Sequence, residues 1–472
     1  MAKYTDNING YIEAENDLFV FHITDQLVSM LPAERDPIGQ NEAIKRLRNN
    51  YHKLPHYLLG TDEQYFKVAI FRNLDMEVRS SLSGYPSFCF YAPLIIRSGG
   101  NASEYYRNLP ETWNKYHAIS FYGGNINAIY NPAVSIIQPT WEEVASSSGI
   151  RDIKFRSYEE YTKSINCEID GEKFEFSITV TQKGDRNDPE KMGAYNLGER
   201  NACIRLVFEK PQDFDTFPKY FNIIQKLVAI LTRQNNVTFN AYLCQKRPDD
   251  KLLYPTAVCY TFERYEDFSK RRPDKVIPIE IILPYIPEII NRITSDFYAP
   301  LFVLLPDSNK DAKRISITNI QDLCTALEVV YGFRKEKREK DQTIEALKKE
   351  IKKTIKVFLS EHDNNFDINR QTNISSSFQY LSITSKEKIL TLYNEYKEII
   401  DHITDKWRLH NLTYEDIVAF VDLRNNKTHS GIIEMGNAAN YYVPLFALVY
   451  TSYFKETGIS EELISNLLDN LF

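Results

Sequence analysis

The chain has 472 residues, and its 43% hydrophobic and 13% aromatic content is sufficient for the cores of roughly two to four folded domains. The formal net charge of −7 excludes a protein that coats nucleic acid over its whole surface, although a local basic patch is compatible with it. The six cysteines include no Cys-x-x-Cys pair, so the sequence indicates neither a zinc knuckle nor a disulfide framework, and a reducing environment fits best.

The N-terminal part of the chain predicts a sheet-rich fold. Short β-branched or alternating segments separated by turn residues continue to about residue 310. Such segments pair readily when a glycine at the turn can adopt a positive φ. Two hairpins of this kind are predicted, namely residues 117–122 with 125–130 around Gly123-Gly124, and residues 165–169 with 173–180 around Asp170-Gly171.

Helices are predicted within this part as well. Apolar residues recur at helical spacing over residues 217–233, which predicts a helix that covers the sheet. A second helical segment, about residues 281–293, is interrupted by Pro284 and Pro287. We therefore expect an α+β domain over residues 1–310.

From about residue 318 to residue 472 the periodicity is almost entirely helical and predicts an all-α bundle. Thr384-x-x-Glu387 is a capping-box pattern that opens one of its helices. Thr413-x-x-Asp416 is a similar start for a later helix. The fold class is therefore α+β, with a sheet-rich domain followed by a helical bundle.

The stretch from Arg334 to Lys356 is locally basic. It contains ten basic and five acidic residues, a net charge of +5 in a chain whose total is −7. A solvated helix with ion pairs between successive turns is the more common explanation of such a stretch. Attraction of RNA phosphates is the functional alternative.

The sequence predicts neither secretion nor a transmembrane segment. Residues 1–6 have no apolar signal core, and the longest apolar run, Val443 to Tyr450, is far shorter than a bilayer requires. We therefore expect a cytoplasmic protein that has no membrane partner.

The hexapeptide RNNKTH, residues 424–429, follows the amphipathic helix that Thr413 opens. Arginine stays protonated at working pH and binds phosphate with a planar fork, while histidine can take and return a proton near neutrality. Arg424 and His429 together offer what cleavage of an RNA phosphodiester needs, without a metal or another cofactor. The hexapeptide therefore predicts a ribonuclease site.

Arg424 and His429 are not predicted to lie on one face of their helix. Arg424 follows Phe420 and Val421 by one turn on the core-facing stripe. Five residues advance a helix by about 500°, so His429 lies about 140° from Arg424 if the helix continues that far. Two copies related by a twofold axis can place both pairs around a shared cleft more easily than one copy can. The spacing therefore favours a homodimer.

The hexapeptide resembles the signature of HEPN domains, in which an arginine, then a polar residue, is followed a few positions later by a histidine. Four residues intervene here, and Asn425 is the first of them. The wider layout is similar to the ApeA-type abortive-infection proteins, with a sheet-containing N-terminal domain, a Leu-x-x-Ala-Leu-Glu-like opening of the bundle at residues 323–328, and an aromatic helix after the motif. The resemblance of the bundle covers roughly the last third of the chain.

The resemblance implies a metal-independent endoribonuclease of a bacterial anti-phage system, with a composite site in a HEPN homodimer. His429 would be the general base or acid, Arg424 would bind the scissile phosphate, and Asn425 would hold the histidine or the phosphate. Lys427 is assigned to RNA binding. The implied partners are RNA, with transfer RNA among the candidate substrates, and a phage-encoded protein as a trigger. The products would be a 2′,3′-cyclic phosphate and a 5′-hydroxyl, and DNA would be spared because it lacks the 2′-hydroxyl.

Other readings of the same residues stay open. Arg424 and His429 are also compatible with an ion pair inside the bundle and a histidine at a helix end. One alternative function is a catalytically inactive HEPN dimer that binds RNA or a protein partner, with Arg424 as a phosphate clamp. Another is a purely structural helical dimerisation module. Arg46 and His52 form a loose second copy of the motif, but the apolar Leu47 follows the arginine, so we interpret that copy as surface structure.

Overall fold

A computed structural model gives the fold of most of the chain. It describes residues 7–24, 26–73, 79–80, 87–98, 113–137, 154–183, 199–246, 253–261, 275–307, 311–362, 367, 370, 373–374, 383–430 and 437–472. Within these ranges, the description does not extend to the side chains of residues 79–80, 154, 182–183, 199, 313, 335–341, 425–430 and 438.

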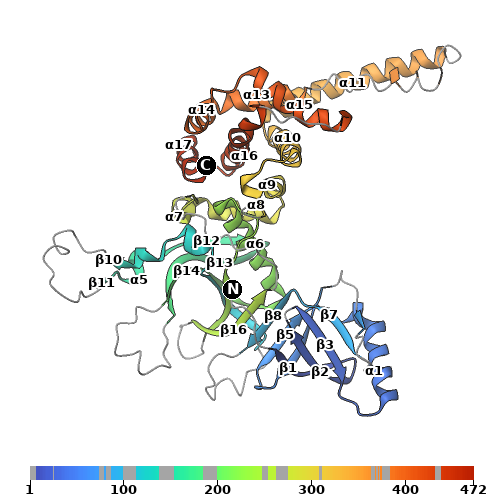
Figure 1. Cartoon of the computed structure of the whole chain (residues 1–472), viewed down its shortest axis with the longest axis vertical. Coiled ribbons are helices and arrows are strands. Elements are labelled where there is room, and N and C mark those ends of the chain that lie inside the picture. The colour runs from blue at the N-terminus through green and yellow to red at the C-terminus, as the bar shows by residue number, and fades with distance from the viewer. Residues whose placement is uncertain are drawn as a thin grey trace. The chain divides into compact units, whose positions relative to one another are not determined.

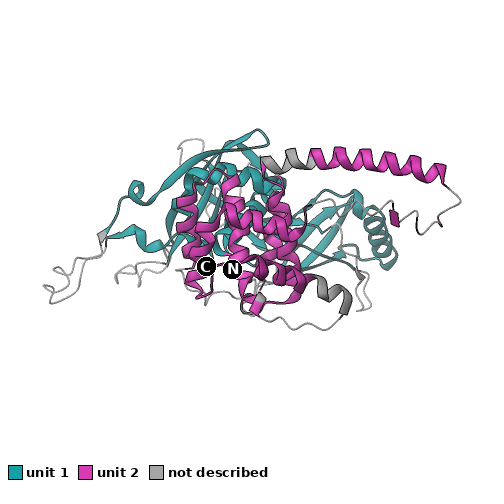
Figure 2. Ribbon diagram, turned by 90° about the horizontal axis from the view of Figure 1, so that it is seen from above, with its two compact units in different colours: residues 1–232, 236–273, 278–294 teal, residues 233–235, 274–277, 295–472 magenta. Residues whose placement is uncertain are grey.

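The chain divides into two compact units (Figure 2). The sheet unit comprises residues 1–232, 236–273 and 278–294, and the helical unit comprises residues 233–235, 274–277 and 295–472. The last change from one unit to the other along the chain falls between residues 294 and 295, and the sequence predicts a domain boundary near residue 310.

The sheet unit is built on one antiparallel sheet, to which fourteen strands of the described residues belong (Figure 1). Each strand hydrogen-bonds to the next, in the order β12 (Lys163–Ile169), β13 (Glu172–Lys183), β14 (Glu199–Asp213), β9 (Lys115–Tyr122), β15 (Asn240–Lys246), β16 (Leu253–Thr261), β8 (Leu94–Ser98), β5 (Lys67–Phe71), β4 (Tyr57–Asp62), β1 (Ile8–Ala14), β2 (Asp17–Thr24), β3 (Leu27–Pro32), β7 (Phe88–Tyr91) and β6 (Arg79–Ser80). A separate two-stranded sheet joins β10 (Ile136–Ile137) to β11 (Lys154–Phe155).

The predicted hairpin around Asp170-Gly171 is confirmed. Strands β12 and β13 pair from Ile169 opposite Glu172 outward, and the two turn residues between them have φ values of 52° and 84°. Two positive φ values are what a tight two-residue hairpin turn requires. Alternate residues of β13 are buried on one face, as the pattern predicts: Phe174, Phe176, Ile178 and Val180.

The predicted hairpin around Gly123-Gly124 is wrong. Both glycines have positive φ, but β9 leads into the short helix α3 (Ile126–Ile129) instead of a second strand. Strand β9 is already paired with β14 on one side and β15 on the other, so neither of its edges is open to a partner formed by residues 125–130. Asn125 instead binds Thr238, donating from its backbone amide at 2.8 Å and accepting the Thr238 amide on its side chain at 2.8 Å.

Helices cover the sheet as the apolar spacing predicts. Helix α6 (Phe217–Thr232) contributes Phe217 and Tyr220, which pack on Phe121 of β9 and Phe208 of β14. The proline-interrupted segment forms α7 (Ile279–Ile282), a 3-10 turn and α8 (Ile286–Thr294). The unit also contains α1 (Pro37–Asn50) and α5 (Tyr158–Tyr161).

The helical unit contains, among its described residues, the helices α9 (Ala299–Leu304), α10 (Ile317–Tyr331), α11 (Lys335–Glu361), α13 (Ser385–Glu395), α14 (Lys397–Lys406), α15 (Tyr414–Ser430), α16 (Tyr442–Glu456) and α17 (Glu461–Leu471). Helices α10 and α16 pack against each other and bury Leu327 and Leu448 completely. The sheet-rich part followed by a helical part confirms the α+β prediction. Of the helices in the described part of the chain, none combines the length and the apolar content needed to cross a bilayer.

Candidate functional site

Helix α15 carries the hexapeptide, and its start is fixed by the predicted capping box. The Thr413 hydroxyl and backbone amide both donate to the Asp416 carboxylate, at 2.7 and 2.9 Å, and the Asp416 amide returns a bond to the hydroxyl at 3.2 Å. Burial would raise the pKa of Asp416, but the bonds from Thr413 and from His410 outweigh it, so this pKa is lowered. The charged carboxylate therefore favours the helix start.

The core-facing stripe of α15 leads directly to Arg424. Ile417, Phe420 and Val421 are buried, with at most 3% of their surface exposed. Arg424 lies one turn beyond Phe420, and 32% of its side chain is exposed. An arginine thus occupies the position at which the stripe reaches the edge of the core.

Glu328 of α10 is the partner of Arg424. Arg424 Nη1 donates to Glu328 Oε1 at 2.7 Å, and the hydroxyl of Ser385, the first residue of α13, donates to the same oxygen at 2.6 Å. Lys388 Nζ lies 3.9 Å from the other oxygen, Oε2. Glu328 therefore joins three helices, α10, α13 and α15, around one carboxylate.

The charge state of this junction follows from its contacts. Burial works to raise the pKa of Glu328, but the hydrogen bonds from Ser385 and Arg424 and the positive charges of Arg424 and Lys388 outweigh burial and lower it. Glu328 is therefore ionised at neutral pH. One turn before it on α10, burial raises the pKa of the Cys324 thiol to about 12, so this cysteine is not a nucleophile at neutral pH.

A second ion pair supports the same helices without touching Arg424. Lys386 Nζ of α13 lies 2.9 Å from Asp422 Oδ1 of α15. Both side chains are partly exposed, so the pair is expected to contribute little to stability.

The remaining residues of the hexapeptide lie on the last turns of α15. The backbone is helical through Ser430, so Arg424 and His429 belong to one continuous helix, about 140° apart around its axis and about 7.5 Å apart along it. The side chains of Asn425, Lys427 and His429 lie outside the described residues. The geometry of the site is therefore known at Arg424 and its partners.

Glu328 and Ser385 are the site residues that the sequence did not single out. Glu328 ends the Leu-x-x-Ala-Leu-Glu segment, and Ser385 follows the capping Thr384, so each stands in a pattern that has a purely structural explanation. Only their meeting with Arg424, which is 96 residues from Glu328 in sequence, distinguishes them.

The second Arg/His copy lies on the sheet unit, in different surroundings. Arg46 of α1 donates to both carboxylate oxygens of Asp17, at 2.9 and 2.8 Å, and 48% of its side chain is exposed. His52 follows in a 3-10 turn, where its side chain is exposed. This copy fits the interpretation as surface structure.

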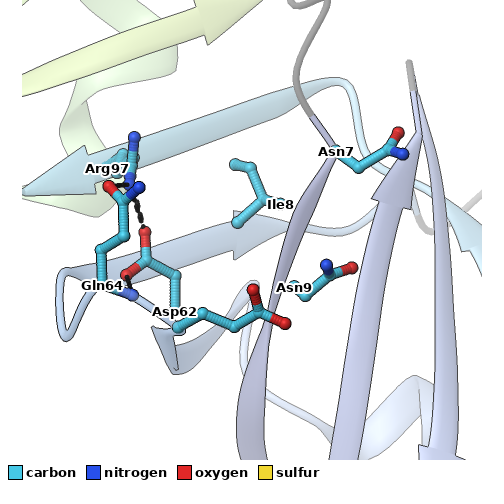
Figure 3. A pocket seen from close by; sticks show the side chains of 7 residues that line it. Asn7, Ile8, Asn9, Asp62, Gln64 and Arg97 are labelled. Atoms are coloured by element: carbon cyan, nitrogen blue, oxygen red, sulfur yellow. Dashed lines mark hydrogen bonds and ion pairs between the residues drawn. The ribbon is translucent and has the colours of Figure 1, made fainter.

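A small polar cavity of about 170 Å³ lies in the sheet unit (Figure 3). Its arginine, Arg97, donates to Asp62 at 2.7 Å and to Gln64 at 2.8 Å, and its guanidinium lies 4.5 Å from the centre of the Phe66 ring. Asp62 in turn accepts the backbone amides of Gln64 and Phe66. These contacts hold the loop between β4 and β5, and we assign the cavity no further role.

Comparisons of the chain with family models, curated proteins and solved structures found no match.

Proposed function

We propose that this protein is a metal-independent endoribonuclease that acts as a homodimer, with Arg424 and His429 in a composite site. The observation that carries the proposal is the ionised Glu328, which holds the guanidinium of Arg424 at the end of the core-facing stripe of α15. A phosphate-binding arginine needs such a fixed orientation, because its planar fork binds phosphate through directed N–H bonds.

Glu328 leaves Arg424 able to bind a phosphate. An arginine has five N–H donors, and the bond to Glu328 uses a hydrogen on Nη1. Arginine is not deprotonated in proteins, so the guanidinium keeps its charge whatever its partner. We therefore assign Glu328 the part of a positioning residue, and Arg424 that of the group which stabilises the charge developing on the phosphate.

The reaction we propose needs only the substrate and the side chains. The 2′-oxygen attacks the adjacent phosphorus while a histidine takes its proton, the bond from phosphorus to the 5′-oxygen breaks, and that oxygen receives a proton from a histidine. A 2′,3′-cyclic phosphate and a 5′-hydroxyl result. Asn425 would hold His429 or the phosphate, and Lys427 would contact the RNA backbone.

The separation of Arg424 and His429 around α15 supports a composite site. The two positions lie about 140° apart around one helix. Two copies related by a twofold axis can therefore place both pairs around a shared cleft more easily than one copy can. In the biological setting that we propose, the enzyme acts in bacterial anti-phage defence, on RNA that includes transfer RNA. The sheet unit would restrain it until a phage-encoded protein releases it.

The Arg424–Glu328 pair also favours a second candidate function. An arginine bound by a glutamate between three helices can serve the bundle alone, in a dimer that binds RNA or a protein partner without cleaving it. In that case neither Arg424 nor His429 affects any chemical step.

Subunit mixing tests the composite nuclease. Arg424→Ala and His429→Ala are each expected to be inactive on RNA in EDTA, whereas a mixture allowed to exchange subunits should regain part of the activity, because a mixed dimer keeps one intact arginine and one intact histidine. Exchange is monitored with differently tagged chains. A mixture that exchanges subunits but stays inactive would contradict the composite site.

A further inference from the structure

Helix α11 (Lys335–Glu361) is the longest helix of the described residues, at 27 residues. It projects from the other helices of its unit in both views, and no described helix or strand packs along it (Figures 1 and 2). Most of its length is therefore presented to solvent.

One side of α11 is a lysine face, which we define as Lys348, Lys349, Lys352, Lys353 and Lys356. These positions recur with a spacing of one and then three residues, so at about 100° per residue they fall within an arc of about 140°. They extend over about 12 Å of the helix axis. Lys348 is paired with Glu345 at 2.8 Å, whereas no carboxylate among the described residues pairs with the other four, which are all exposed.

The adjoining side of α11 is apolar, and the side chains of Leu347 and Phe358 on it are exposed. Ile344, Ile351, Ile355 and Leu359 form a stripe at helical spacing, and all four are partly buried. A bilayer or a second α11 would have to engage this stripe. An antiparallel α11 pair would in addition bring two lysine faces together, which like-charge repulsion opposes. The lysine face is the positively charged face that α11 offers to a partner, and its chemistry fits a polyanion.

We infer that the lysine face of α11 binds the phosphate backbone of the RNA substrate, at nucleotides other than the one that is cut. This inference rests on the proposed function for the identity of the polyanion. Lysine contacts phosphate as a point charge and reads no base, so this binding is independent of sequence. In a chain of net charge −7, these four lysines lie on one helix face and pair with no carboxylate of the described residues, so they mark where a polyanion can approach.

The salt dependence of RNA binding tests this inference. The slope of log affinity against log salt concentration is about −0.7 for each phosphate neutralised on a single strand. Replacing Lys349, Lys352, Lys353 and Lys356 together by Gln should therefore reduce the magnitude of the slope by about 3. The probe is a single-stranded RNA of mixed sequence, and both proteins carry His429→Ala so that the probe stays intact.

A matched control removes the same charge elsewhere. Lys45, Lys163, Lys173 and Lys210 are exposed, lie on four different elements of the sheet unit, and are replaced by Gln together. This control should leave the salt slope unchanged. Glutamine is a good helix former, so circular dichroism should show the same helix content in all variants.

The outcomes separate this inference from the proposed function. Suppose that the wild type cleaves RNA and that the salt slope of RNA binding is the same with and without the four α11 substitutions. The lysine face is then not an RNA-binding surface, while the proposed nuclease function is retained. If the α11 variant loses slope and the wild type never cleaves, the RNA surface stands without the nuclease. Binding to equimolar phosphatidylglycerol and phosphatidylcholine vesicles that only the α11 variant loses, with RNA binding unchanged, would overturn the inference in favour of a membrane.

Discussion

Arg424 Nη1 donates to Glu328 Oε1 at 2.7 Å and so connects the hexapeptide helix to a residue 96 positions earlier in the chain. The same oxygen accepts the Ser385 hydroxyl, so the position of the guanidinium depends on three helices. A side chain fixed in this way can act in catalysis or in stability. The two roles differ in what they predict for variants of Glu328.

Glu328→Gln should lower the cleavage rate about tenfold, equivalent to about 1.4 kcal/mol in the barrier, with the dimer still folded. The amide keeps an acceptor for Arg424 and Ser385 but loses the charge that orients the guanidinium. Asp422→Asn is the matched control, because it breaks the neighbouring Lys386–Asp422 pair without touching Arg424. Equal cleavage rates per folded dimer for wild type, Glu328→Gln and Asp422→Asn would show that Glu328 positions nothing for catalysis.

The coupling between Arg424 and Glu328 should depend on pH in a defined direction. The pKa of Glu328 in the folded chain lies below its usual value of 4.5, so the pair stabilises the fold above pH 4.5 and loses this effect as the pH falls through the folded pKa. A double-mutant cycle with Arg424→Ala and Glu328→Ala should give a coupling of about 1 kcal/mol at neutral pH. Urea unfolding at several pH values measures it, and a coupling that grows on acidification would be incompatible with this geometry.

Tyr453→Phe should stabilise the helical unit by about 1 kcal/mol. Tyr453 is fully buried, its ring centre lies 5.1 and 5.4 Å from those of Phe297 and Phe333, and its hydroxyl has no hydrogen-bond partner among the described residues. Tyr393→Phe is the matched control and should destabilise by a similar amount, because the Tyr393 hydroxyl donates to Asp401. Denaturant titration measures both variants, and a loss of stability in Tyr453→Phe would mean that its hydroxyl is satisfied.

Two glycines in the sheet unit should respond differently to the same substitution. Gly171 has φ +84° and open space around it, so Gly171→Ala should cost about 1 kcal/mol of backbone strain. Gly124 also has positive φ, but an added Cβ would lie 1.8 Å from the Thr238 carbonyl oxygen, so Gly124→Ala should cost about 3 kcal/mol or more. The unfolding free energies of the two variants, each compared with that of the wild type, test this difference. Equal losses of stability at both positions would contradict the contact of Gly124 with Thr238.

The same two glycine turns show how far the sequence predicts the fold. At Asp170-Gly171 the turn and the strands on either side are local, so the hairpin can be predicted from adjacent residues. At Gly123-Gly124 the outcome depends on Thr238, 113 residues from Asn125, and on two strands that already flank β9. No local pattern contains that information.

The candidate site, too, could be predicted from the sequence only where its structure depends on neighbouring residues. The start of α15 at Thr413 and its core-facing stripe could be predicted, because capping and periodicity are local. The pairing of Arg424 with Glu328 could not be predicted, because the local sequence around an arginine at the end of an apolar stripe does not indicate which distant residue it will contact. The α+β class followed from composition and periodicity over long segments, where errors at single turns do not matter.

The central claim is that Arg424 and His429 cut RNA, and end mapping after incubation of purified protein with total bacterial RNA in EDTA tests it most directly. Wild type and His429→Ala are compared, each with and without phage lysate. We expect the wild type alone to cut, leaving 2′,3′-cyclic phosphate and 5′-hydroxyl ends, and to spare DNA. Absence of cleavage under every condition, from a dimer that still binds RNA, would contradict the claim and favour a binding protein.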